Sequence, residues 1–169
     1  MDTQVYGLLN EQIQRELYSA YLYLDMANYY SDEGLDGFSN WFHVQAQEEM
    51  SHAMLFRSYL LNNDQPVKLL AIDAPKGGYK SFDKPLAESL QHEKMVTASI
   101  SNIYEAALAV KDFRATEFLN WFIKEQGEEE KNATDLIKKY DLFGSDAKGL
   151  YALDQELSAR VYTPPSLTL

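Results

Sequence analysis

The sequence predicts an all-α protein: a four-helix bundle with one long crossover between helices two and three, plus a short fifth helix. Two observations support this prediction. Apolar residues recur at steps of three and four along four long stretches, which is the pattern of amphipathic helices. The connections between these stretches are short, except for one segment of about 20 residues, rich in proline and glycine, between the second and third stretches.

The first two helices are bounded by clear capping and turn signals. Asp2 or Thr3 can cap a helix that runs to about residue 30, and the turn sequence of residues 31–34 ends it. A second helix is expected over 36–62, before a turn that contains Pro66. This short connection makes the first two helices an antiparallel hairpin.

The second half of the chain repeats the arrangement. Pro85 suits the first turn of a third helix that runs to about residue 110. A fourth helix is expected over 113–140, with Gly144 closing it, and a shorter fifth helix over 147–161. A helix of about 27 residues is roughly 40 Å long, and an extended segment of about 20 residues can reach roughly 65 Å. The crossover can therefore span the bundle, which makes the second and third helices parallel.

Composition narrows the possible partners and ligands. The net charge of −11 argues against nucleic acid and anionic membranes as partners. No signal peptide or membrane-spanning run is visible, so we expect a cytoplasmic location. Because the chain has no cysteine, any metal site must use oxygen and nitrogen ligands.

A glutamate interrupts each apolar stripe near mid-helix, at Glu16, Glu49, Glu93 and Glu129. Burying one ionised carboxylate costs several kcal/mol, so four at one level cannot all be charged without cations. Bound metal ions are the simplest solution. His52 follows Glu49 by three residues, which places a carboxylate and an imidazole on one helix face, a pair that suits a transition metal.

The second half offers no matching histidine. Gln126 stands three residues before Glu129, so the two metal positions are expected to be unequal, one with a nitrogen ligand and the other nearly all oxygen. Glu125, Glu128 and Glu129 lie at steps of three and four and can face one further ion. The alternative for this last cluster is a solvated acidic helix face.

Several motifs together resemble those of a non-haem ferritin of the bacterial type. They are Leu9-Asn10-Glu11-Gln12 with Glu16-Leu17-Tyr18-Ser19, Ala46-Gln47-Glu48-Glu49-Met50-Ser51-His52, His92-Glu93, Glu125-Gln126 with Glu128-Glu129-Glu130, and Gly149-Leu150-Tyr151. The resemblance covers nearly the whole chain and implies a single ferritin-like domain over 1–162, with a loose tail at 163–169. It also implies a cage of 24 subunits that stores ferric mineral, with a ferroxidase centre inside each bundle.

The resemblance implies three iron positions and a role for one tyrosine. The first iron would bind Glu16, Glu49 and His52. The second would share Glu49 as a bridge and bind Glu93 and Glu129, with Gln126 nearby. A third would use Glu48, Glu125 and Glu128, with Glu129 available for sharing. Tyr23, two turns after Glu16, can hydrogen-bond a ligand or supply an electron.

The expected function is oxidation of Fe²⁺ with O₂ at an intrasubunit di-iron centre and storage of the Fe³⁺ product. Met50 occupies the place of the haem-ligating methionine of bacterioferritins, but the missing second Glu-x-x-His favours a non-haem protein. Two alternatives remain open: a di-iron carboxylate oxidase that acts on an organic substrate, and an acidic structural bundle without metal.

Overall fold

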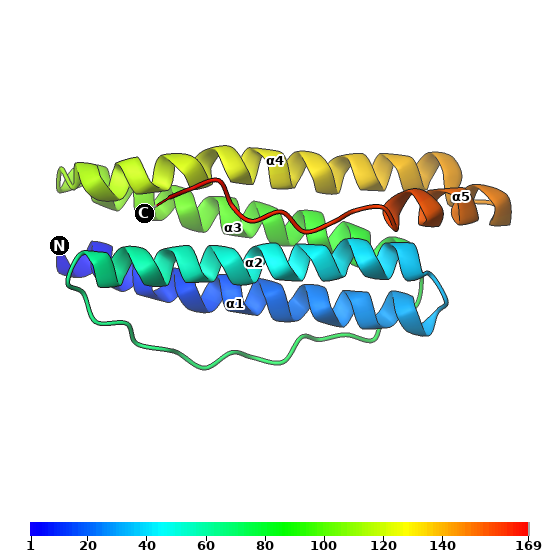
Figure 1. The fold of residues 1–169 in the computed structure, drawn as a ribbon, viewed down its shortest axis with the longest axis horizontal. Coiled ribbons are helices and arrows are strands. Elements are labelled where there is room, and N and C mark those ends of the chain that lie inside the picture. Colours follow the sequence, from blue (N-terminus) through cyan, green and yellow to red (C-terminus); the bar gives the residue numbers. More distant parts are fainter. Residues whose placement is uncertain (169) are drawn as a thin grey trace.

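The computed structural model describes residues 1–168, and within them it contains helices and connecting segments but no strand (Figure 1). The predicted all-α class and the four-helix bundle are confirmed. The helices are α1 (Thr3–Asp32), α2 (Asp36–Asn62), α3 (Asp83–Ala109), α4 (Phe113–Phe143) and α5 (Ala147–Leu157). Their bounds lie within three residues of the predicted ones, except that α5 ends earlier than expected.

The bundle consists of two antiparallel hairpins, α1–α2 and α3–α4, joined by the long crossover (Figure 1). Asp2 caps α1 by accepting hydrogen bonds from the backbone N–H groups of Gln4 and Val5. Gly34 has a φ of 78° in the first turn, a left-handed conformation that glycine adopts without strain. Residues 63–82 run the length of the bundle beside α1, which makes α2 and α3 parallel, as expected (Figure 1).

The core consists of two apolar clusters with a polar layer between them. One cluster takes residues from 5–13, 56–60, 96–107 and 115–122. The other takes residues from 22–30, 38–46, 86 and 136, together with two leucines of α5. In every long helix the glutamate singled out from the sequence falls between the two clusters, at Glu16, Glu49, Glu93 and Glu129.

α5 is fastened to the beginning of α2. The buried Asp154 carboxylate accepts hydrogen bonds from the backbone N–H groups of Gly37 and Phe38 at 2.8 and 3.0 Å. It caps α2, whose own N-cap residue Leu35 has no side chain able to do so. The Asn40 amide donates to the backbone carbonyls of residues 157, 158 and 160. These contacts hold residues 158–161 in a non-helical conformation, although the sequence predicted that the helix continues to residue 161.

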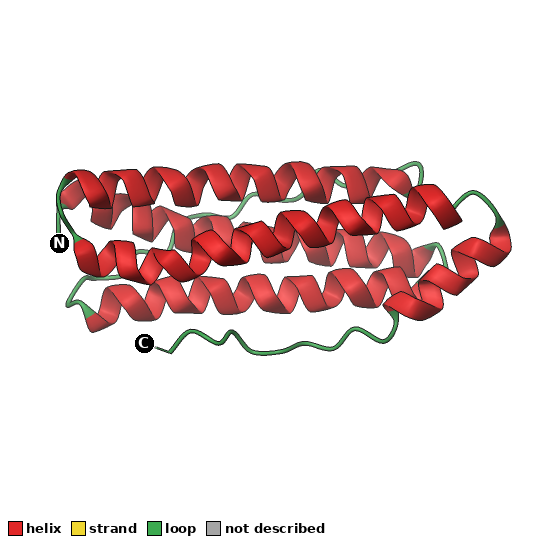
Figure 2. Cartoon of the chain, turned by 90° about the horizontal axis from the view of Figure 1, so that it is seen from above, coloured by secondary structure: helices red, strands yellow, loops and turns green. Residues whose placement is uncertain are grey.

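After a turn at residues 158–159, residues 160–168 run along the bundle and return toward the end that holds the N-terminus (Figures 1 and 2). Tyr162 and Ser51 hydroxyls lie 2.7 Å apart, Trp121 donates to the Ser166 hydroxyl at 3.1 Å, and Leu167 packs on an apolar cluster. The predicted loose tail therefore makes contacts over its described part, and residue 169 lies outside the described residues. Within residues 1–168, no helix combines the length and apolar character that a membrane crossing needs.

Candidate metal centre

Glu16, Glu49 and His52 meet in the polar layer. One ligand atom from each of the three side chains lies within 4.8 Å of the other two. All three side chains are at most 2% exposed, and the His52 Nδ1 atom lies 3.5 Å from Glu49 Oε2. Oε2 of Glu16 is buried and has no hydrogen-bond partner among the described residues. A buried carboxylate oxygen without a partner, beside an imidazole and a second carboxylate, is the arrangement that a bound cation would complete.

The other hairpin adds Glu93 from α3 and Glu129 from α4, both buried. The Gln126 amide donates to Glu93 Oε2 at 3.2 Å and to the backbone carbonyl of the same residue at 3.3 Å. The hydroxyl of the buried Tyr23 donates to Glu93 Oε1. Each oxygen of the Glu93 carboxylate thus accepts a hydrogen bond from a residue that was predicted at this centre, Tyr23 or Gln126.

Gln45 connects the two hairpins across the centre. Its amide nitrogen lies 3.2 Å from Glu49 Oε1 and 2.7 Å from Glu129 Oε2, so one side chain donates to carboxylates of α2 and α4. The side chain is 1% exposed. The predicted ligands from both halves of the chain therefore belong to one hydrogen-bonded layer.

Burial makes the charged state of these carboxyl groups costly. It raises the pKa of Glu16, Glu49 and Glu129 well above the usual range, and the negative charge of a neighbouring glutamate raises each pKa further. Burial also raises the pKa of Glu93, against the opposing effect of the hydrogen bonds from Tyr23 and Gln126. Divalent cations would replace the protons that these groups otherwise hold, because an opposite charge favours the ionised form.

The residues predicted for a third site are arranged differently. Glu125 Oε1 lies 3.9 Å from His52 Nε2, and Glu125 is 27% exposed. Glu48 Oε2 accepts a hydrogen bond from Arg160 at 2.5 Å, whereas Glu128 is exposed. Among residues 1–168, donor atoms of three ligands converge at Glu16, Glu49 and His52, so the third site stays a prediction.

Sequence reasoning missed three residues that contact the predicted ligands. The Gln12 amide donates to Glu16 Oε1 at 2.8 Å, and Gln45 donates to Glu49. Each glutamine stands four residues before its glutamate, a same-face spacing that could have revealed both. Arg160 contacts Glu48 from 112 positions away in the sequence, and no local pattern indicates such a contact.

Comparisons with known proteins agree with this geometry. Residues 6–143 match the family described as Ferritin-like domain. A probable bacterial non-heme ferritin-like protein of Haemophilus influenzae is 34% identical over 157 residues, which are 93% of this chain and 95% of that protein. A bacterial non-heme ferritin of Campylobacter jejuni is 36% identical over 155 residues, 92% of this chain and 93% of the relative.

Solved structures of ferritins have the same fold as this chain. A ferritin of Archaeoglobus fulgidus, engineered into a closed form, superposes with a TM-score of 0.94 at 42% identity, over 96% of this chain and 99% of the other. An open-pore ferritin from the same archaeon has a TM-score of 0.93 at 42% identity, over 95% and 99% of the two chains. The family match, the curated relatives and the shared fold together show that this chain belongs to the ferritin family.

Proposed function

We propose that this protein oxidises Fe²⁺ with O₂ at a di-iron centre inside each bundle and stores the Fe³⁺ product. The observation that carries the proposal is the buried convergence of Glu16, Glu49 and His52. Hydrogen bonds through Gln45 extend this group to Glu129 of the other hairpin. The membership of the chain in the ferritin family supports the same function.

Iron is the substrate here, and the ligand set suits its oxidation. The first Fe²⁺ would bind Glu16, Glu49 and His52, and the second would bind Glu49, Glu93 and Glu129. Carboxylate oxygens are hard anionic ligands and stabilise Fe³⁺ relative to Fe²⁺. Each Fe²⁺ loses one electron, and O₂ accepts both electrons with two protons, which reduces it to the level of hydrogen peroxide.

Two neighbouring side chains would assist this reaction. Tyr23 donates to Glu93 Oε1 and so orients a ligand of the second iron. Gln126 donates to the other oxygen of the same carboxylate, which leaves its amide close to the metal without being a strong ligand.

A third iron would lie between Glu48, Glu125 and Glu128, with Glu129 available as a shared ligand. Burial raises the pKa of Glu125, and the nearby Glu128 charge adds to that increase, so a cation between the two would relieve their repulsion. This iron could supply one more of the four electrons that complete reduction of O₂ to water requires.

The protein would work as a hollow cage of 24 subunits in the cytoplasm. Large apolar side chains remain exposed on α1 and on the crossover beside it, and they are available for burial between subunits. They include Tyr21, Leu24, Leu69, Leu70 and Ile72. Size-exclusion chromatography with light scattering gives the mass: a 24-subunit particle is expected, and a monomer or dimer would contradict the cage.

The oxidation step is tested with E49A. Fe²⁺ is added anaerobically and then mixed with air, and the Fe³⁺ product is followed by its absorbance. E49A should oxidise iron far more slowly, since it removes the carboxylate shared by both metal positions. The matched control is E105Q, which neutralises an exposed glutamate of α3 and should behave like the unaltered protein. Rapid oxidation by E49A would refute the proposed centre.

A further inference from the structure

The chain after α5 is held against α2 by a series of polar contacts that advance along both segments in the same direction. The Asn40 amide donates to the backbone carbonyl of Arg160, and about three turns further along α2 the Ser51 hydroxyl contacts the Tyr162 hydroxyl. Gln45 and Glu48 lie between these two contacts on α2. The Arg160 side chain therefore lies against the part of α2 that carries the predicted metal ligands.

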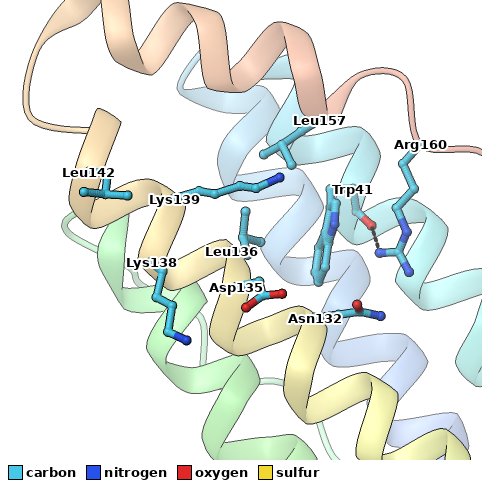
Figure 3. Close-up of a pocket in the computed structure, with 9 residues that line it drawn as sticks. All are labelled: Trp41, Asn132, Asp135, Leu136, Lys138, Lys139, Leu142, Leu157 and Arg160. Carbon is cyan, nitrogen blue, oxygen red and sulfur yellow. Dashed lines mark hydrogen bonds between the residues drawn. The ribbon is translucent and has the colours of Figure 1, made fainter.

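The Arg160 guanidinium contacts three residues of α2. Its Nη1 atom donates to the Trp41 backbone carbonyl at 3.1 Å, and its carbon lies 4.4 Å from the centre of the Trp41 ring (Figure 3). Its Nη2 atom donates to Gln45 Oε1 at 2.9 Å and to Glu48 Oε2 at 2.5 Å. A planar group with fixed donors, stacked on an aromatic ring, has little freedom to reorient.

The contact with Gln45 determines which way its amide points. Because Oε1 accepts from Arg160, the amide nitrogen faces inward, where it donates to Glu49 and Glu129. When metal binding keeps both carboxylates ionised, a flipped amide would place its N–H groups against the guanidinium and its carbonyl oxygen against the two carboxylates. In the flipped amide, donors would face donors and acceptors would face acceptors at both contacts, which is costly in a water-poor site.

We propose that Arg160 is a positioning residue of the metal centre, acting through Gln45: it fixes the amide whose N–H groups orient Glu49 and Glu129. The inference rests on the proposed function, since it concerns the same centre. It links the segment after α5 to metal binding inside the bundle. Arg160 itself touches no predicted ligand of the two central iron positions.

A simpler role for Arg160, as a positive charge beside acidic residues, predicts different results. A lysine keeps the charge but cannot donate to Trp41, Gln45 and Glu48 from one rigid plane. Methionine keeps an unbranched side chain on the Trp41 ring and removes the charge. Arg160 is 20% exposed and borders a cavity of about 410 Å³, so both replacements have room (Figure 3).

The test measures binding of Co²⁺ without oxygen, by titration calorimetry and by the visible absorption of the bound metal. R160K and R160M should both bind Co²⁺ at the central site about 10–100-fold more weakly, the usual effect of losing a residue that orients metal ligands, and the absorption bands should shift. Q45M should cause a similar loss. The double variant R160K/Q45M should lose no more than Q45M alone, because both changes remove the same restraint.

The matched control is R57M, which makes the same change at an exposed arginine of α2. It should bind Co²⁺ like the unaltered protein. Unchanged Co²⁺ affinity and absorption in R160K would overturn the inference. Tighter Co²⁺ binding in R160M would overturn it too, because that result is expected if Arg160 acts only as a positive charge. Losses that add in R160K/Q45M would show that Arg160 does not act through Gln45.

These outcomes are separable from failure of the proposed function. If the unaltered protein binds no Co²⁺ inside the bundle, or E49A binds it equally well, the metal centre itself is wrong. If the unaltered protein binds and E49A does not, only the Arg160 variants decide the inference. Size-exclusion mass and circular dichroism verify that each variant is folded and assembled, and Q45M, altered within α2, tests the amide even where a variant of residue 160 fails to assemble.

Discussion

Replacing Glu49 by glutamine should stabilise the metal-free protein at neutral pH, although it removes a proposed metal ligand. Glu49 is 2% exposed, and burial followed by the Glu93 charge raises its pKa well above the ordinary value of 4.5. Its contribution to stability is therefore complete below the ordinary carboxyl pKa and is lost as the pH rises toward the folded-state pKa. Glutamine does not titrate and suffers no such loss.

The magnitude has an upper bound. One pKa unit corresponds to about 1.36 kcal/mol, so keeping a carboxyl of ordinary pKa 4.5 protonated at about pH 7 costs about 3 kcal/mol. The new amide can still accept from Gln45, but imperfect hydrogen bonding would cost about 1 kcal/mol. The net gain is therefore at most about 2 kcal/mol, which raises the melting temperature by at most about 4–8 °C in a domain of this size.

The assay is thermal unfolding of metal-free protein, held with a chelator, from mildly acidic to neutral pH. The difference between E49Q and the unaltered protein should grow with pH, whereas E105Q, at an exposed position, should show little difference. Added Co²⁺ should reverse the order, because ligation favours the ionised carboxylate that E49Q lacks. Equal or lower stability of metal-free E49Q at neutral pH would refute the reasoning.

Three further changes have definite expected results. G127A should stabilise α4 by about 0.5–1 kcal/mol, because a methyl group there meets no atom within 4 Å, and a fall in melting temperature would contradict this. G37A should detach α5, since a Cβ atom would lie 1.7 Å from the Asp154 carbonyl oxygen; hydrogen exchange over 147–168 should increase, and unchanged protection would argue against the contact. Y23F should slow Fe²⁺ oxidation by removing a hydrogen bond to Glu93, while Fe²⁺ oxidation at the unaltered rate would leave Tyr23 a packing residue only.

The sequence was sufficient for the bundle because helix patterning and turn residues act locally. The bounds of α2 were predicted at both ends, since Gly34 and Pro66 interrupt the chain on either side. α5 was predicted four residues too long, because its end is set by Asn40 of α2, a contact that no local pattern contains. Long-range contacts of this kind decide where marginal helices stop.

In the candidate metal centre, too, some residues could be predicted from the sequence and others could not. Glu16, Glu49 and His52 were predictable because a charged residue in an apolar stripe needs a partner. The hydrogen-bond partners of these residues were harder to predict. Gln12 and Gln45 lie on the same helix faces as Glu16 and Glu49, but glutamine is common on helices and does not by itself indicate a metal site. The contacts of Arg160 could not be predicted at all, since they depend on how the segment after α5 folds back along the bundle.

Crystals soaked with Fe²⁺ and recorded at the iron absorption edge would test the central claim most directly, since anomalous scattering counts iron positions and identifies their ligands. Two strong iron positions are expected in each bundle, one beside His52 and the other on the far side of Glu49. A weaker third is expected beside Glu125. The expected ligands of the two strong positions are Glu16, Glu49, His52, Glu93 and Glu129. Iron found only on the surface, with none bound by Glu49, would contradict a di-iron centre inside the bundle.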